Sequence, residues 1–86
     1  MKEERKMWSE GKIAIPNGAN MSVYQYIVKH GETPSKEKGI DGGKILKLQI
    51  IAHDKRTAEW NEGTWEIEPE EAETKLAYMI CLQKFN

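Results

Sequence analysis

The sequence predicts an α+β domain, in which a small antiparallel sheet of four to five strands packs against one C-terminal helix as a two-layer sandwich. Three observations predict it. Short runs rich in β-branched and aromatic residues alternate between apolar and polar positions, which is typical of strands. Turn residues, mainly glycine, asparagine and aspartate, separate these runs. From Pro69 onward the apolar residues fall at helical spacing instead.

The first two predicted strands are residues 12–16 and 21–30. Asn17-Gly18 lies between them and suits the positive φ angles of a tight turn. Alternation in the second strand gives two sets of side chains on opposite faces, namely Val23, Gln25, Ile27 and Lys29 against Tyr24, Tyr26 and Val28. Because both faces are partly apolar, we expect a central strand, or one whose second face meets a partner.

The run over residues 45–54 alternates more clearly. Its apolar positions are expected in the core and its polar positions on the opposite face, which gives Leu46, Leu48 and Ile50 against Lys47, Gln49 and His53. A hairpin turn is expected at residues 53–56, and residues 57–61 form the returning strand. Gly63 would mark a bulge or a second turn before residues 64–67 resume the pairing.

A C-terminal helix of about seventeen residues is predicted, which spans about 25 Å at 1.5 Å per residue. Pro69 suits the first helical position, and Glu70 and Glu71 beside it suit a helix N-terminus. The positions at helical spacing, expected to form the apolar face, are Ala72, Leu76, Met79, Ile80 and Leu82 or Gln83.

One domain accounts for the chain, with residues 8–86 as the domain and residues 1–7 as a charged, frayed tail. A domain of 86 residues has a thin margin of stability, because it buries only about 60 to 65% of its unfolded surface. Cys81 has no second cysteine to bridge, and His30 and His53 lack the paired spacing of a zinc site. We therefore expect a homo-oligomer, with no cofactor and no metal.

The charge and hydropathy argue against two classes of partner. Thirteen basic and fourteen acidic side chains give a net charge of −1, whereas proteins that hold duplex nucleic acid by its phosphates are normally basic. The first residues lack the apolar segment of a signal peptide, and no segment approaches about 18 apolar residues. With one free cysteine, the sequence predicts a cytoplasmic protein without duplex nucleic acid or membrane contact.

The segment of residues 31–44 is long for a connection in so small a domain, and loops of this length are more often binding elements or disordered. Three lysines lie near three glycines, whose N–H groups could cradle an anion, and a serine adds a hydroxyl, which singles out Lys36, Lys38, Lys44, Gly39, Gly42, Gly43 and Ser35. The segment is not a Walker A loop, since it is one residue short and Ile45 stands where Ser or Thr holds magnesium. Two interpretations stay open: a structural loop with a solvated face, and an anion-binding or partner-binding loop.

Three tryptophans are the second candidate feature. Since a buried aromatic side chain removes roughly 150 to 250 Å² from water, two of the three are expected in the core. The remaining one, with Tyr24 or Tyr26, would form a stacking platform for a base or a partner's side chain. Together with the loop, the predicted ligand-binding residues are Ser35, Lys36, Lys38, Gly42, Gly43, Lys44, Tyr24, Tyr26 and Trp60.

No catalytic set can be assembled from the sequence, so a non-enzymatic protein is predicted. His30 and His53 end the two central strands, with Glu32 and Asp54 nearby, but a histidine at a strand end is usually a surface residue. Cys81, at a helical position, is typical of a buried small hydrophobe rather than a catalytic thiol.

Motifs along most of residues 8–85 carry a resemblance to a known family: W-x-x-G-x-I at 8–13, K-H at 29–30, P-S-x-x-x-G-I-D-G-G-x-I-x-K-L at 34–48, and G-x-W at 63–65. On these motifs the chain resembles a family of small uncharacterised proteins of Gram-positive bacteria and their phages. The family brings no activity, so no site residue is carried over. The resemblance implies a phage or prophage accessory protein in the host cytoplasm.

The leading hypothesis is a small binding protein that sequesters an anionic nucleotide-like ligand to counter host defence. Lysines and glycine N–H groups would hold phosphate, and Trp or Tyr would stack on the base. The alternative is an inhibitor or adaptor that binds a host nucleic-acid-processing enzyme through Glu66, Glu70 and Glu73. A pocket lined by the loop and an indole would favour the first hypothesis, and an exposed flat sheet would favour the second.

Overall fold

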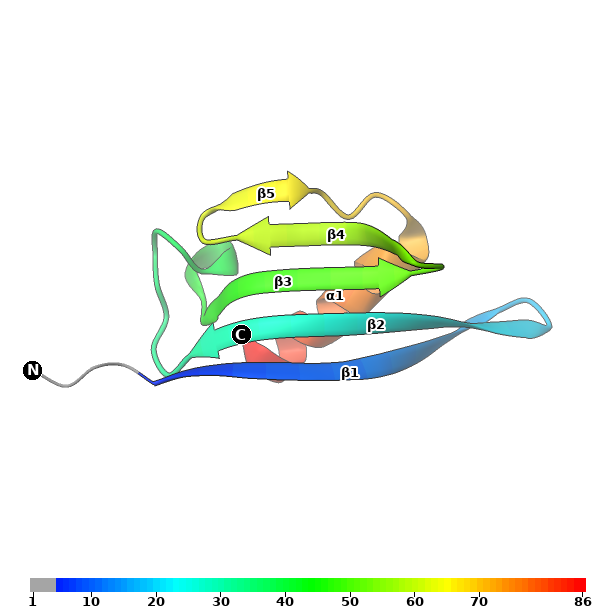
Figure 1. Cartoon of the computed structure of the whole chain (residues 1–86), viewed down its shortest axis with the longest axis horizontal. Coiled ribbons are helices and arrows are strands. Elements are labelled where there is room, and N and C mark those ends of the chain that lie inside the picture. The colour runs from blue at the N-terminus through cyan, green and yellow to red at the C-terminus, as the bar shows by residue number, and fades with distance from the viewer. Residues whose placement is uncertain (1–4) are drawn as a thin grey trace, which may run out of the picture.

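The computed structural model describes residues 5–86, which form a five-stranded antiparallel sheet and a C-terminal helix (Figure 1). This confirms the predicted α+β fold. The strands lie side by side in chain order, as β1 (Lys6–Asn17), β2 (Asn20–Gly31), β3 (Ile45–Ala52), β4 (Lys55–Asn61) and β5 (Thr64–Ile67). The helix α1 (Ala72–Phe85) lies behind the sheet in Figure 1, so the face toward the viewer is uncovered and is called the open face below.

The first strand is longer than the sequence predicts. Of the tail expected at residues 1–7, positions 1–4 lie outside the described residues, and Lys6 and Met7 already belong to β1. β1 pairs with β2 along its whole length and forms one edge of the sheet. The β1–β2 hairpin also extends past the other strands (Figure 1). An edge strand needs less apolar alternation, which explains why the sequence indicated only residues 12–16.

Two-residue turns join β1 to β2, β3 to β4 and β4 to β5 and fix their registers, whereas the loop of residues 31–44 joins β2 to β3. Gly18 and Ala19 connect β1 to β2, and the positive φ of Gly18 (64°) suits glycine at the first turn position. The β3–β4 turn consists of His53 and Asp54. Gly63, at φ 111°, belongs to the turn between β4 and β5, so the second turn is the correct interpretation of this position.

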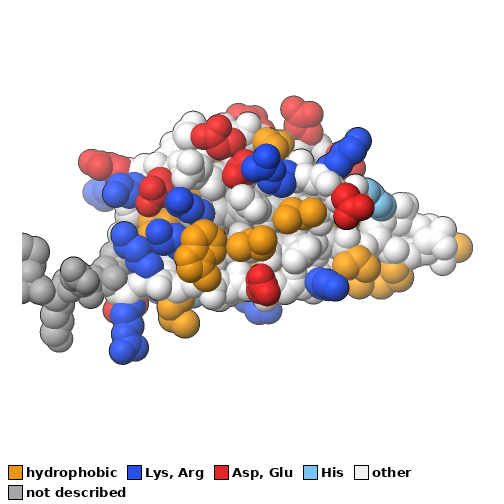
Figure 2. Space-filling model, viewed as in Figure 1, with side chains coloured by type: hydrophobic (Ala, Val, Ile, Leu, Met, Phe, Trp, Pro, Cys, Tyr) orange, Lys and Arg blue, Asp and Glu red, His pale blue; other side chains and the backbone are white. Residues whose placement is uncertain are grey.

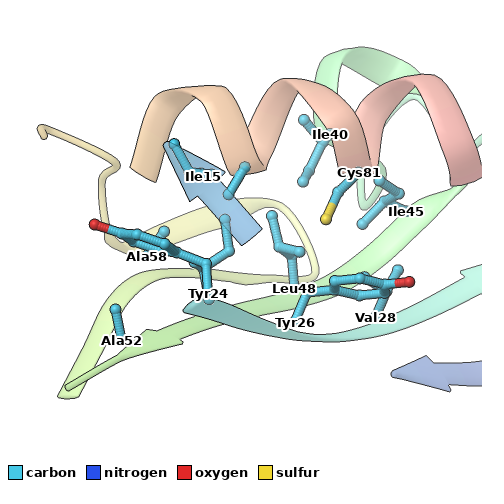
Figure 3. Packing of buried hydrophobic residues seen from close by; sticks show 12 residues of the cluster. Ile15, Tyr24, Tyr26, Val28, Ile40, Ile45, Leu48, Ala52, Ala58 and Cys81 are labelled. Carbon is cyan, nitrogen blue, oxygen red and sulfur yellow. The ribbon is translucent and has the colours of Figure 1, made fainter. Parts of the chain in front are cut away.

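The core lies between the sheet and α1 (Figure 3). Strands contribute buried side chains in cross-strand pairs, such as Val28 opposite Leu48 and Tyr26 opposite Ile50. The helix contributes Ala77, which is fully buried. The predicted core positions of β3 are confirmed, because Leu46, Leu48 and Ile50 are all buried.

The predicted start of the helix is wrong, and so is most of its predicted apolar face, although Leu82 of that set does pack against the core. The helix begins at Ala72 rather than Pro69, and its buried residues are Thr74, Ala77 and Cys81, with Tyr78, Leu82 and Phe85 packed against the core. Leu76 and Met79, expected to cover the sheet, are 45% and 55% exposed. Apolar residues occur on both sides of this helix, so spacing alone does not select the buried side. Within residues 5–86, no helix has the length and apolar character needed to cross a membrane.

Candidate ligand-binding face

The loop of residues 31–44 is folded on itself through backbone hydrogen bonds. Gly39 and Gly42 donate to the carbonyls of Ser35 and Gly39, while Gly43 donates to Ile40 at 2.8 Å. The backbone N–H of Gly31 donates to the carbonyl of Lys44 at 3.0 Å. The glycine N–H groups that an anion nest would use are therefore already bonded inside the loop.

Two residues from elsewhere in the chain anchor this loop. The Asn86 side chain donates to the Ile40 carbonyl (3.1 Å) and accepts a bond from the Ile45 N–H (2.9 Å). The Trp60 indole N–H donates to the Lys38 carbonyl at 2.9 Å. These contacts, with the burial of Ile40 (1% exposed), favour a structural interpretation of the loop.

The polar side chains predicted in the loop line neither of the two hollows described below. The Ser35 hydroxyl accepts the Lys38 N–H at 3.2 Å within the loop. Lys36 and Lys38 are exposed, and Lys44 is half-buried.

The predicted aromatic partners lie on the helix side of the sheet. Tyr24 and Tyr26 are 2% and 6% exposed, and their hydroxyls meet Glu73 (3.0 Å) and Lys84 (3.3 Å) respectively. Burial, followed by the hydrogen bond to Glu73, raises the pKa of Tyr24. Trp60 is half-buried and packs on Trp65, with ring centroids 5.1 Å apart. Neither tyrosine can therefore stack on a ligand at the open face.

The two histidines and the cysteine considered as catalytic candidates are placed as structural or surface residues. The His30 ring packs on Phe85 at 5.0 Å and lies 3.0 Å from the Ser9 hydroxyl, and His53 is an exposed turn residue. Cys81 is 1% exposed, and burial raises the pKa of its thiol to about 11. Among residues 5–86, no group of three or more His, Cys, Asp or Glu side chains is arranged to hold a metal ion.

The acidic residues of the adaptor hypothesis have different surroundings. Glu73 accepts the hydrogen bond from Tyr24. Glu66 and Glu70 line a shallow hollow together with Glu68 and Glu71, and Lys55 and Arg56 in the same lining balance only part of this negative charge.

The open face carries a different set of side chains, arranged in rows across the strands. Cross-strand partners share a face, so the registers of the paired strands give each row directly. The first row, from β1 to β4, is Trp8, Lys29, Lys47 and Asn61. The second row is Glu10, Ile27, Gln49 and Glu59, and the third is Lys12, Gln25, Ile51 and Arg56. Figure 2 views this face and shows apolar side chains across its middle, with basic side chains gathered at the end nearest the loop.

The first row is electrostatically unusual. Lys29 and Lys47 are direct cross-strand partners, and like charges in that arrangement destabilise a sheet. In the part of the chain that the structure describes, neither lysine forms an ion pair with a carboxylate; Lys29 instead lies over the Trp8 ring, 5.8 Å from its centroid. The Trp8 side chain is 60% exposed, although a large aromatic side chain gains most from burial. We call Trp8, Lys29 and Lys47 the basic–aromatic row.

A shallow hollow of about 330 Å³ adjoins this row. Trp8, Ile27 and Lys47 line it, and its further lining residues are Leu48, Gln49, Glu59, Trp60 and Asn61. The volume is at the lower end of the range of small-molecule sites, about 300 to 1,000 Å³. No residue of the 31–44 loop lines it.

The one carboxylate in the hollow is already engaged. Glu59 accepts hydrogen bonds from Arg56 at 3.0 Å and from Gln49 at 3.1 Å. Because these bonds offset its charge, Glu59 opposes an incoming anion less than a free carboxylate would. The hollow thus combines the aromatic residue Trp8, the cation Lys47 and the amide residues Gln49 and Asn61, and Lys29 lies next to Lys47 outside its lining.

Sequence reasoning missed this site, although a usable signal was present. The alternation of β2 and β3 already separates Lys29 and Lys47 from the core positions. What the sequence did not reveal was the register that makes them neighbours, or that Trp8 is the tryptophan left out of the core. Trp60 and Trp65 are the two that pack against the core, as expected for two of the three.

Comparison with known proteins gives a family but no activity. A family model described as a domain of unknown function (DUF7678) matches residues 7–86. No curated protein and no solved structure matches the chain. The site must therefore be interpreted from its own geometry.

Proposed function

Since the chain belongs to this family of domains of unknown function, which brings no activity with it, we propose from the open face that the protein is a non-enzymatic binding protein for an anionic, nucleotide-like ligand. The observation that carries the proposal is the basic–aromatic row. It places Lys29 directly beside an exposed indole and Lys47 beside Lys29, and among residues 5–86 neither lysine forms an ion pair with a carboxylate. A phosphate and an attached base are the chemical groups that this pair of features fits.

The row supports binding in a simple way. Phosphate oxygens accept charge-assisted hydrogen bonds from Lys29 and Lys47, which relieves the repulsion between these lysines. The base stacks on the Trp8 indole, a contact worth about 1 to 3 kcal/mol in single-stranded nucleic-acid complexes. Its polar edge meets the amides of Gln49 and Asn61 in the adjoining hollow.

The proposal keeps the ligand class that the sequence predicts and moves the site. The loop of residues 31–44 then has a supporting role, since its backbone is held by Trp60 from β4, next to the hollow. The phage or prophage setting, and a role in countering host defence, stay predictions implied by the family resemblance.

Isothermal titration calorimetry with cyclic dinucleotides and cyclic ADP-ribose isomers tests the proposal. We expect binding by the unmodified protein, and loss of at least tenfold in affinity for Trp8→Ala, which removes the stacking surface. Trp8→Phe keeps an aromatic face and is expected to bind within a few-fold of the unmodified protein. Lys29→Ala combined with Lys47→Ala is expected to lose phosphate recognition.

The matched control is the triple change of Lys36, Lys38 and Lys44 to alanine. It removes three positive charges from the loop, one more than the Lys29 and Lys47 variant removes from the open face, while leaving the basic–aromatic row intact. If this triple variant lost binding and the Lys29 and Lys47 variant kept it, the ligand would sit at the loop and the proposed site would be wrong. Uniformly absent heats with folded protein would remove the nucleotide function altogether.

A further inference from the structure

The outer edge of β1 is the longest unpaired edge in the sheet. β1 runs from Lys6 to Asn17 and has a neighbour only on the β2 side, whereas the opposite edge strand, β5, covers only Thr64–Ile67. Almost every β1 side chain is exposed or half-buried. Such an edge is a template for a further strand unless something protects it.

The hairpin geometry determines which β1 groups face outward. A two-residue turn makes Asn17 and Asn20 a hydrogen-bonded pair, and such pairs alternate along antiparallel strands. Odd-numbered β1 residues therefore bond to β2, and even-numbered residues direct their N–H and C=O groups outward. Pro16 occupies an even position, where its missing N–H breaks no bond to β2.

We propose that β1 pairs with β1 of a second copy of this chain, antiparallel, around a two-fold axis at Gly11. The inference is independent of the ligand proposed above. Only a pairing of even with even residues lets the outward groups bond one another. With the axis at Gly11, Glu10 lies opposite the partner's Lys12 and Lys12 opposite the partner's Glu10, which gives two ion pairs on the open face.

Repulsion between like charges disfavours three nearby registers, with the axis at Glu10, Lys12 or Ser9. An axis at Glu10 would place the two copies of Glu10 opposite each other, and an axis at Lys12 would do the same with Lys12. An axis at Ser9 would place Lys6 opposite the partner's Lys12. Like charges directly opposite are destabilising, so the register at Gly11 is the self-complementary one.

The same register also suits the uncharged side chains. Trp8 lies opposite the small Ala14 of the partner subunit, which leaves room for the indole. Gly11 lies on the axis in a non-hydrogen-bonded pair, where backbones approach to about 4.5 Å. The two-fold axis is perpendicular to the sheet, so both helices lie on one side and both basic–aromatic rows on the other.

Charge reversal combined with sedimentation equilibrium tests the proposal. The unmodified protein is expected at twice the monomer mass of 9.9 kDa. Glu10→Lys alone and Lys12→Glu alone each replace two ion pairs by two repulsions, so we expect dimerisation to weaken roughly tenfold or more. The double variant Glu10→Lys with Lys12→Glu restores both pairs with reversed sign and is expected to dimerise again.

A mixture of the two single variants gives the sharpest outcome. One chain then carries Lys at positions 10 and 12 and the other carries Glu at both, so a mixed dimer forms while each variant alone stays monomeric. Ala14→Pro is a second test, because it removes an outward N–H without touching the bonds to β2, and we expect it to give a folded monomer. A monomeric unmodified protein, or variants that all keep the dimer mass, would overturn the proposal.

Discussion

Single residues far apart in the sequence decide whether the long loop holds its shape. Asn86 is the clearest case, since its side-chain amide satisfies one carbonyl and one N–H of the loop and the following strand. Gly39 and Gly43 are constrained by close packing, because a Cβ at Gly39 would overlap the Gly43 carbonyl and a Cβ at Gly43 would overlap Asn86. The loop therefore depends on residue identities at a few positions more than on its length.

Asn86→Ala is expected to lower the free energy of unfolding by about 1 to 3 kcal/mol, because it leaves two partly buried backbone groups without partners. Urea unfolding followed by circular dichroism measures this. Gln83→Ala, at an exposed position of α1, is the matched control and should stay within about 0.5 kcal/mol of the unmodified protein. Equal stabilities of the two variants would show that the Asn86 bonds contribute nothing.

Stability is expected to fall between about pH 9 and pH 11 because of Cys81. The unfolded thiol ionises near its usual pKa of 9.0, while burial raises the pKa in the folded protein to about 11. The unfolded state therefore binds fewer protons in this window, and the loss approaches roughly 2 to 3 kcal/mol above the folded pKa. Urea unfolding at several pH values measures the slope.

Cys81→Ala is the control for this pH dependence. The variant should be less stable at neutral pH because it shrinks a buried side chain, but its decline at alkaline pH should be shallower. Some decline should persist, since burial also raises the pKa values of Tyr24 and Tyr78. A slope identical to that of the unmodified protein would contradict the assignment to Cys81.

At the scale of elements, α1 shows how packing overrides a sequence pattern. Both sides of the helix carry apolar residues, and the buried side is the one whose rings reach the sheet aromatics, with Tyr78 5.3 Å from Trp65 and Phe85 5.7 Å from Tyr26. Leu76 and Met79 are left on the solvent side. Their burial was predicted from helical spacing, which places residues on one side of a helix but does not tell which side packs against the sheet.

Substitutions on the two sides of α1 are therefore expected to differ. Leu76→Lys lies on the exposed side and should change the free energy of unfolding by less than about 0.5 kcal/mol. Ala77→Leu inserts volume into a fully buried position and should cost about 1 to 3 kcal/mol. Thermal unfolding of both variants measures the two changes in stability. A severe loss in Leu76→Lys with tolerance of Ala77→Leu would reverse the assignment of the faces.

The elements also show what the sequence could predict. Alternation identified β2, β3 and the core positions of β3, because one side of each central strand is buried against α1. The beginning of β1 escaped prediction, since an edge strand with Ser9, Glu10 and Gly11 has no such constraint. The basic–aromatic row escaped because it depends on register, which is set by turns and bulges rather than by any one strand.

At the scale of the whole molecule, the proposed function accounts for two destabilising features of the open face. Two lysines repel each other across β2 and β3, and an indole stays in water, in a domain whose size leaves little stability to spare. A face selected for stability alone would place an opposite charge beside Lys29. The arrangement is understandable when an anion supplies that charge.

Lys47→Glu is therefore expected to stabilise the ligand-free protein by about 0.2 to 1 kcal/mol, because it turns a cross-strand repulsion into an attraction with Lys29. The same variant is expected to lose nucleotide binding. Thermal unfolding and calorimetry on one preparation measure both effects. Lys75→Glu, on the exposed side of α1, controls for the change in net charge, and a stabilisation equal to that of Lys47→Glu would contradict the explanation.

The projecting β1–β2 hairpin has a practical consequence (Figure 1). Its turn is open, with no atom within 4 Å of the position where a Cβ on Gly18 would lie. Because the native Cys81 thiol is buried, Ala19→Cys would offer one accessible attachment point for a dye or a sensor surface. A protein immobilised there would keep its open face and the centre of β1 available to solution, so ligand capture and self-association could be followed on the same molecule.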